Sequence, residues 1–255
     1  DLIAFTGSTA AGRKVAAAAG ANLKKVNLEL GGIDPFIVCE DAKLEVAVPG
    51  VAWARLLNAG QVCTSPKRVY VVKSILEPFI KQIVEYAKNV RLGDPLDLAT
   101  DVGPLISNEA ALKVEEQVKQ AVKEGAKLLL GGKRCQPNGL KGHFFEPTVL
   151  CGVRHGGVCT TEEIFGPVIS IIEARDVNHA IEMANDSKYG LGASIYTDSL
   201  EIAIRAMENI KAGTFWVNDP LTDNDAGPFG GMRWSGMGRE LGEEGLEAFR
   251  EPKHV

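Results

Sequence analysis

The sequence is organised around the run Asn58-Ala59-Gly60-Gln61-Val62-Cys63-Thr64-Ser65-Pro66-Lys67-Arg68, with Cys63 at its centre. Cys63 follows an expected helix and lies among small and polar residues, where a turn can present its sulfur to a ligand. The thiolate is the reactive form of cysteine, and nearby positive charge or a helix N-terminus favours it. Lys67 and Arg68 are close in sequence, although a strand that begins there could carry them away. The run alone leaves two interpretations open, an inert buried thiol and a nucleophile.

The composition is typical of a globular protein. The chain has 255 residues, of which 45% are hydrophobic and 24% charged, enough for one large domain or two small ones. Its net charge of −5 offers no basic surface to nucleic acid or to an acidic membrane. No apolar run approaches the ~18 residues that cross a bilayer. We therefore expect neither nucleic acid nor a membrane as a partner. The first residues look like the inside of a strand, so we expect the chain to begin within a longer protein.

The cysteines and histidines indicate neither a disulfide framework nor a metal site. The five cysteines are odd in number and include no Cys-x-x-Cys pair, and the four histidines lack an i, i+4 spacing with an acidic partner. We expect a reducing, cytoplasmic setting and no metal.

Apolar runs alternate with segments of helical periodicity along the whole chain, the pattern of an α/β protein. Strands are expected at residues 2–6, 26–30, 35–39, 68–72, 127–130, 145–150, 168–174, 193–196 and 214–217. Helices are expected at residues 9–19, 44–57, 75–89, 110–124, 178–185 and 199–209. We expect the first strand to be buried and Pro49 to be partly tolerated near the start of its helix. The glycine-dense stretch 226–242 is expected to form neither ordinary helix nor strand.

A glycine turn, Gly7-Ser8-Thr9-Ala10-Ala11-Gly12, joins the first expected strand to the first helix. The N–H groups and the dipole of a helix N-terminus favour an anion there, typically a phosphate. The turn lacks the lysine of a P-loop, because Arg13 follows its second glycine, and it does not match the G-x-G-x-x-G fingerprint. A phosphate site and a plain turn capped by Ser8 remain alternatives.

Two acidic motifs lie beside glycines. Glu29 closes an apolar strand before two glycines, and it is either a general base whose pKa burial raises or a strand-end carboxylate bonded to the glycine amides. Glu162 and Glu163 precede Phe165 and a Gly-Pro turn. One of these acids could accept hydrogen bonds from ribose hydroxyls while Phe165 lies against a flat ring, or the segment could be a solvated turn with a core phenylalanine.

Within the glycine-dense stretch 226–242, the run 229–240 carries Phe229 together with methionine and tryptophan side chains. Glycine permits close backbone approach, which suits a loop that lines a substrate site, whereas flexible linkers rarely carry such large side chains. We interpret the run as a substrate-lining loop.

The ordered motifs of this chain resemble those of the aldehyde dehydrogenase superfamily. They are Phe5-Thr6-Gly7-Ser8 with Gly12, Glu29-Leu30-Gly31-Gly32, Gly60-Gln61-Val62-Cys63, Glu163-Ile164-Phe165-Gly166-Pro167, Trp216-Val217-Asn218 and the glycines and Arg-Glu pair of 230–240. The resemblance covers the chain from end to end.

The resemblance implies a mechanism. Cys63 attacks an aldehyde carbonyl to form a thiohemiacetal, hydride passes to the nicotinamide ring of NAD or NADP, and Glu29 activates the water that hydrolyses the resulting thioester. The backbone N–H of Cys63 gives one oxyanion-hole donor. The implied cofactor contacts are Phe5, Gly7, Ser8, Leu30, Glu163 and Phe165. The implied substrate-contacting and supporting residues are Val62, Thr64, Asn218, Phe229 and Glu240, of which Glu240 serves a proton path from Glu29.

The resemblance also implies a domain organisation. An aldehyde dehydrogenase-like catalytic domain with a mostly parallel sheet is expected over residues 32–233. Residues 1–31 are the implied remnant of a Rossmann-like NAD(P)-binding domain, and residues 234–255 a tail that returns to it. The implied substrate is a small-molecule aldehyde, and the implied parent protein is a homodimer or homotetramer.

Family members are about twice as long as this chain, so we expect the chain alone to oxidise aldehydes poorly or not at all. An alternative function is a truncated non-redox module, either a thiol esterase-like remnant or an assembly unit. The sequence selects neither the aldehyde nor NAD over NADP, because the residue that chooses the cofactor is expected before Asp1.

Overall fold

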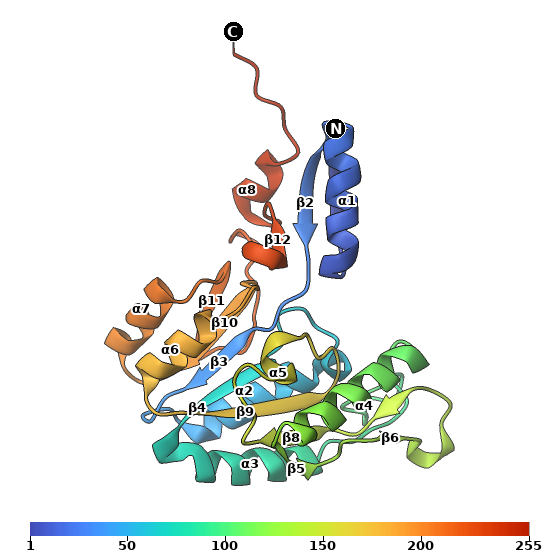
Figure 1. Ribbon diagram of the computed structural model, residues 1–255, viewed down its shortest axis with the longest axis vertical. Coiled ribbons are helices and arrows are strands. Elements are labelled where there is room, and N and C mark those ends of the chain that lie inside the picture. The colour runs from blue at the N-terminus through green and yellow to red at the C-terminus, as the bar shows by residue number, and fades with distance from the viewer. Residues whose placement is uncertain (255) are drawn as a thin grey trace.

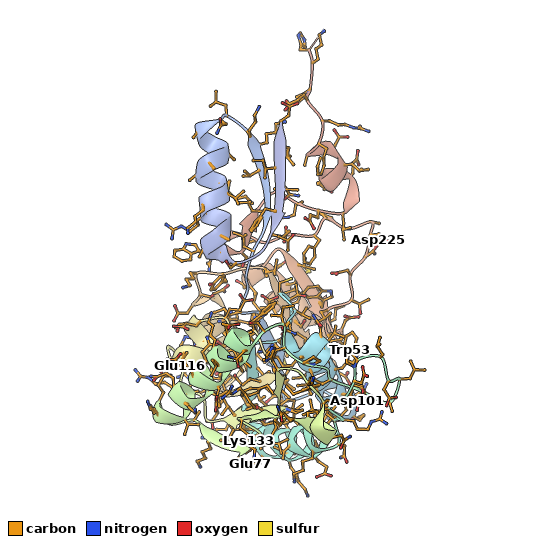
Figure 2. The ribbon with its side chains drawn as sticks, turned by 90° about the vertical axis from the view of Figure 1, so that its right-hand side faces the viewer. Trp53, Glu77, Asp101, Glu116, Lys133 and Asp225 are labelled. Atoms are coloured by element: carbon orange, nitrogen blue, oxygen red, sulfur yellow. The ribbon has the colours of Figure 1, made fainter. Side chains whose placement is uncertain are left out.

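The computed structural model describes residues 1–254, which contain a seven-stranded, a three-stranded and a two-stranded sheet. The three-stranded sheet has the strand order β1 (Leu2–Thr6), β2 (Lys25–Glu29) and β12 (Gly236–Met237). Helix α1 (Thr9–Ala21) connects β1 to β2, which run parallel. Figure 1 shows this small sheet with α1 and α8 (Gly242–Glu247) above the larger part of the molecule, with both chain termini at that end. Figure 2 shows the same two-part arrangement from the side.

The larger sheet has seven strands. Their order is β11 (Thr214–Val217), β10 (Gly192–Tyr196), β3 (Pro35–Val38), β4 (Arg68–Val72), β9 (Val168–Ala174), β8 (Thr148–Cys151) and β5 (Lys127–Leu130). All neighbouring pairs are parallel except β5 and β8, which are antiparallel. The expected mixed α/β fold with a mostly parallel sheet is therefore confirmed.

Helices cover both faces of this sheet, as buried parallel strands require. The helices α2 (Leu44–Leu56) and α3 (Leu76–Lys88) pack on one face, where they meet Phe36 and Val38 of β3. The helices α4 (Asn108–Lys123), α6 (Val177–Asn185) and α7 (Leu200–Asn209) pack on the other, where they meet Ile37. Successive side chains of a strand point to opposite faces, so the continuous apolar run of β3 feeds both cores.

The predicted elements occur close to their expected positions, with three corrections. The first concerns burial. β1 was expected to be buried, but Ile3 is exposed and Phe5 only half-buried. β1 is an edge strand that pairs with β2 alone, so one of its edges meets no other strand among residues 1–254.

The second correction concerns residues 145–150, expected to be one strand. They belong to two strands, β7 (Phe144–Phe145) and β8, with Pro147 between them. Proline lacks the N–H that a continuous ladder needs. β7 pairs with β6 (Arg134–Cys135) in a separate two-stranded sheet.

The third correction concerns the glycine-dense stretch 226–242. It was expected to form no strand, yet Gly236 and Met237 form β12 and pair with Glu29 and Leu28 of β2. A Cβ atom on Gly236 would collide with the carbonyl oxygen of Leu28. The glycine is therefore what allows the strand to form.

Pro49 lies inside α2, which continues to Leu56 as expected. No helix among residues 1–254 combines the length and the apolar character needed to cross a membrane.

Candidate active site around Cys63

The turn before Cys63 is held in an unusual backbone conformation. Asn58, Ala59 and Gly60 have φ values of 49°, 57° and 74°, so three consecutive residues are left-handed. This region costs energy for any residue with a Cβ. The buried Arg55 braces the turn, because one of its terminal nitrogens, Nη1, donates to the carbonyl of Gly60 at 3.2 Å. This turn separates Cys63 from the end of α2 at Leu56.

We expect Gly60→Ala to destabilise the chain by about 2–4 kcal/mol, because the added methyl group is strained at this φ and overlaps the backbone of Gly166. The midpoint of urea unfolding measures the effect. Gly20→Ala is the matched control, since Gly20 lies in α1 with open space around its Cβ position. There alanine should leave stability unchanged or raise it by about 0.5–1 kcal/mol. Equal midpoints for the two variants would contradict the role assigned to Gly60.

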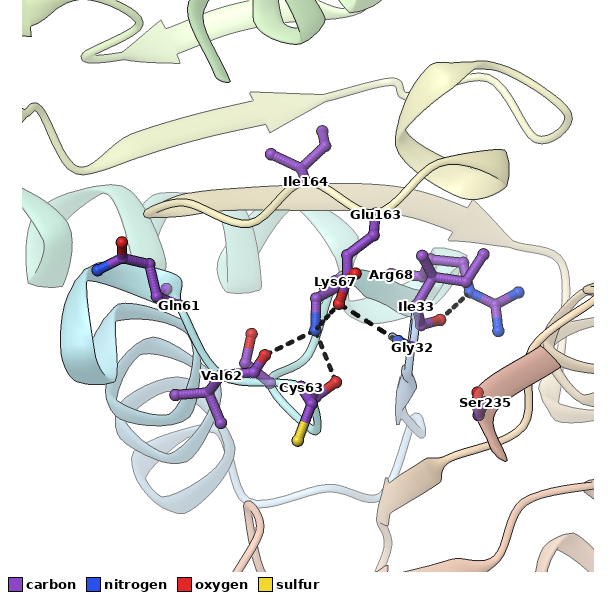
Figure 3. A network of polar contacts seen from close by, with 12 residues as sticks. Gly32, Ile33, Gln61, Val62, Cys63, Lys67, Arg68, Glu163, Ile164 and Ser235 are labelled. Atoms are coloured by element: carbon purple, nitrogen blue, oxygen red, sulfur yellow. Dashed lines mark hydrogen bonds and ion pairs between the residues drawn. The ribbon is translucent and has the colours of Figure 1, made fainter. Parts of the chain in front are cut away.

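The two cations that follow Cys63 go to different places. Arg68 begins β4 and turns away, donating from Nε to the carbonyl of Ile33 at 2.6 Å and from Nη2 to that of Ala184 at 3.0 Å. Lys67 stays under the turn, where its ammonium donates to the carbonyls of Val62 at 2.8 Å and Cys63 at 2.7 Å. Figure 3 shows both bonds. Of the two candidate positive charges, the structure brings only Lys67 against the loop that carries Cys63.

Glu163 completes a polar network with Lys67 and the Gly31-Gly32 turn. Its carboxylate lies 3.5 Å from the Lys67 ammonium and accepts a hydrogen bond from the Gly32 N–H at 3.2 Å (Figure 3). A Cβ on Gly31 would lie 2.5 Å from the other carboxylate oxygen, and one on Gly32 would lie 3.1 Å from the Cys63 carbonyl. The two glycines therefore let the strand that carries Glu29 approach both Glu163 and the Cys63 loop.

Glu29 is a buried carboxyl group, and neither of its oxygens has a hydrogen-bond partner among the described residues. Burial, with a further contribution from the charge of Glu240, raises the pKa of this carboxyl to about 8, against the opposing effect of Arg239. The strand-end interpretation is wrong for this carboxyl, because neither glycine amide bonds to it and that of Gly32 bonds to Glu163 instead, while the role of general base stays a prediction. A pKa near neutrality suits proton transfer.

The thiol of Cys63 lies in a mixed electrostatic environment. Burial raises its pKa, the ammonium of Lys67 lowers it, and the carboxyl of Asp34 raises it again. Smaller contributions come from the backbone N–H of Thr64, which lowers the pKa, and from Glu163, which raises it. Asp34 is itself buried, which raises the pKa of its carboxyl to about 7.

The expected cofactor residues of the small sheet lie around the β1–α1 junction. Ser8 caps α1, its hydroxyl accepting a hydrogen bond from the Ala11 N–H at 3.2 Å. The ring of Phe5 packs where a Cβ on Gly7 would lie, and the side chain of Leu30 does the same at Gly12. Ser8 therefore caps the helix, as one alternative expected, and phosphate binding at this helix N-terminus stays a prediction.

Some of the other predicted site residues lie in the chain segments of Cys63 and Glu163, and another lies at the end of a strand of the larger sheet. Val62 and Thr64 flank Cys63, and Phe165 follows Glu163 with its ring partly exposed, 6.0 Å from the Lys67 ammonium. Asn218 instead ties the end of β11 to β10, exchanging side-chain hydrogen bonds with the backbone of Thr197.

Phe229 and Glu240 pair through two backbone hydrogen bonds of 2.7 Å each. They hold the ends of the glycine-dense loop, and Gly230 of this loop lies directly against Glu29, so that a Cβ there would be 2.7 Å from a carboxylate oxygen.

Sequence reasoning missed Arg55 and Asp34 and left Lys67 undecided. Arg55 is buried and donates to the carbonyl of Ile164 at 2.7 Å, so it links the Cys63 turn to the Glu163 segment. A single arginine in a mostly apolar helix gives no sign in sequence of whether it is buried. Within residues 1–254, no three His, Cys, Asp or Glu side chains gather as metal ligands would.

Comparisons with known proteins place this site in a known context. The model of the family described as "Aldehyde dehydrogenase family" matches residues 1–255. Betaine aldehyde dehydrogenase of Bacillus subtilis (strain 168) is 42% identical over 256 residues, which cover 100% of this chain and 52% of that protein. Retinal dehydrogenase 2 of Gallus gallus is 43% identical over 256 residues, with 100% and 49% covered.

Solved structures of aldehyde dehydrogenases also superpose on this chain. Betaine aldehyde dehydrogenase from Staphylococcus aureus in complex with NAD+ superposes with a TM-score of 0.95 at 38% identity, over 98% of this chain and 50% of that one. Lactaldehyde dehydrogenase from Escherichia coli gives a TM-score of 0.93 at 40% identity, over 97% and 52%. The chain spans about half the length of the relatives that it matches.

Proposed function

Since this chain belongs to the aldehyde dehydrogenase family, we propose that it is the catalytic portion of an NAD(P)-dependent enzyme that oxidises an aldehyde to a carboxylic acid. One observation carries the proposal. The carboxyl of Glu29 is buried without a hydrogen-bond partner in residues 1–254, and Leu30 connects it to two glycines that pack against Glu163 and the carbonyl of Cys63. A candidate base, a candidate ribose ligand and a candidate nucleophile thus converge from three separate parts of the chain.

The residues present fit a nicotinamide dinucleotide. The carboxylate of Glu163 is 21% exposed and can accept hydrogen bonds from ribose hydroxyls. Gly7 and Ser8 begin α1, whose N-terminus favours a pyrophosphate, with Phe5 and Leu30 packed beside them. Phe165 exposes its ring next to Glu163, where it can border the nicotinamide. When bound, the cofactor supplies the hydride acceptor, as NAD or NADP.

In the proposed mechanism, Cys63 reacts as the thiolate. Its sulfur forms a bond to the aldehyde carbon, and the carbonyl oxygen becomes the oxyanion of a thiohemiacetal, which the backbone N–H of Cys63 helps to stabilise. Loss of hydride from this carbon leaves a thioester on Cys63. Val62 and Thr64 flank the sulfur and contact the substrate.

Glu29 performs the hydrolytic step. It takes a proton from water while the water oxygen attacks the thioester carbon, and the carbon–sulfur bond breaks to release the carboxylic acid and the Cys63 thiolate. The proton leaves Glu29 along a path that includes Glu240, whose negative charge is close enough to raise the pKa of Glu29. Asn218 and Phe229 support the walls of the site.

For the domain organisation we propose residues 32–233 as the catalytic domain. Residues 1–31 then belong to the cofactor-binding domain, to which residues 234–255 return. The pairing of β12 with β2 supports this division, because it joins the tail to the small sheet. We propose a small-molecule aldehyde as the substrate and a homodimer or homotetramer as the assembly.

Labelling of Cys63 by a thiol reagent, with and without NAD or NADP, tests the proposed function. We expect one of the two cofactors at saturating concentration to change the labelling rate of Cys63 several-fold, because the ribose ligand Glu163 shares the buried ammonium of Lys67 with the Cys63 loop. Mass spectrometry of the Cys63 peptide gives the rate, and the Cys135 peptide, half-buried on β6, is the internal control. A labelling rate of Cys63 that neither NAD nor NADP changes would favour a non-redox module instead.

A further inference from the structure

Lys67 is a buried cation with an unusual set of partners. Its side chain is 1% exposed, and a buried ammonium is costly unless hydrogen bonds and counter-charges surround it. Burial lowers the pKa of Lys67, while Glu163 and Asp34 oppose that shift. The ammonium therefore contacts two carbonyls and one carboxylate, that of Glu163, and the charge of Asp34 acts on it through space.

The two carbonyls that Lys67 holds belong to Val62 and Cys63, one on each side of the Cys63 Cα atom (Figure 3). Since each peptide group is planar, fixing both carbonyls fixes the two peptide planes that flank this residue. The direction of the Cα–Cβ bond then follows.

The charge of Lys67 also acts on the sulfur, but without a hydrogen bond. Figure 3 shows the sulfur of Cys63 pointing away from the ammonium, so the interaction is through space. Asp34 and Glu163 are the acids that face the same thiol, and the Thr64 N–H is its backbone neighbour. Lys67 is the cation among these groups.

We propose that Lys67 is a positioning residue for Cys63, which fixes the backbone from which the thiol projects and supplies the positive charge that favours its thiolate form. Glu163 tunes this effect, because it partly neutralises the same ammonium at 3.5 Å. The proposal rests on the proposed role of Cys63 as the nucleophile. It can nevertheless be tested separately from that role, since it concerns the ionisation of the thiol before any aldehyde or cofactor is present.

The test is the pH profile of Cys63 alkylation by iodoacetamide, read on the Cys63 peptide by mass spectrometry. In Lys67→Met the inflection should move up by about one pH unit, because an opposite charge that favoured the thiolate is lost. In Glu163→Gln it should move down, because the variant removes a negative charge that acts on the thiol directly and also partly neutralises the ammonium of Lys67. Lys73→Met, which removes an exposed lysine at the end of β4, is the matched control and should leave the profile unchanged.

The opposite signs distinguish positioning by charge from loosening of the loop, since loosening would move both variants in the same direction. If Lys67→Met does not fold, Glu163→Gln still decides, because an unchanged or raised inflection overturns the proposal. Shifts of the expected sign, together with no aldehyde oxidation by the natural protein that carries this chain, would sink the proposed function and leave the role of Lys67 standing. Aldehyde oxidation without these shifts would support the proposed function and overturn the role of Lys67.

Discussion

Replacement of Cys63 by alanine is expected to lower kcat for aldehyde oxidation by at least about 10⁴-fold, the largest effect of any single substitution in the chain. The reason is chemical. Without the sulfur no thiohemiacetal forms, so no carbon atom is held in position to lose hydride, and the residual activity comes from binding alone. The measurement is aldehyde-dependent NADH or NADPH formation by the natural protein that carries this chain.

Cys135→Ser is the matched control for the Cys63 substitution. Cys135 is also a half-buried free cysteine, but it lies on β6 in the separate two-stranded sheet. Its replacement should change kcat by less than about twofold. An equal loss of activity in both variants, or retention of a tenth of the activity in Cys63→Ala, would remove Cys63 from the mechanism.

The second large effect is expected for Glu29→Gln, which should lower kcat by about 10²–10⁴-fold while leaving the first turnover intact. Glutamine fills the same space but cannot accept a proton from water, so the thioester should accumulate. Stopped-flow measurement should then show a burst of reduced cofactor equal to the number of sites, followed by a slow steady state. Loss of the burst together with the steady state would mean that Glu29 acts before the thioester forms.

The pH dependence gives an independent check on Glu29. A general base acts in its ionised form, and burial raises the pKa of this carboxyl to about 8. Where hydrolysis limits kcat, the rate should therefore rise with pH through about 8 and level off above it. The Glu29→Gln variant should lose this inflection. Glu40→Gln, at an exposed position beyond β3, should keep both the rate and the inflection.

The sequence by itself determined the α/β fold and the candidate chemistry, because both are encoded in local patterns. Strand and helix periodicities lie within short segments, so β3 and α3 appear almost where they were expected. The motifs around Glu29, Cys63 and Glu163 are likewise short. Their order along the chain indicated the family that the comparisons then confirmed.

Only the tertiary structure decided which charges and backbones meet. Lys67 and Arg68 are adjacent, yet one lies beneath the Cys63 loop and the other reaches Ile33 and Ala184. Their separation depends on where β4 begins within the seven-stranded sheet, which no local pattern specifies. The exposure of β1 likewise depends on what covers it. The approach of Gly230 to Glu29 joins residues two hundred positions apart along the chain. Long-range packing sets the burial of a charged group, and burial is what gives Glu29 and Lys67 their chemistry.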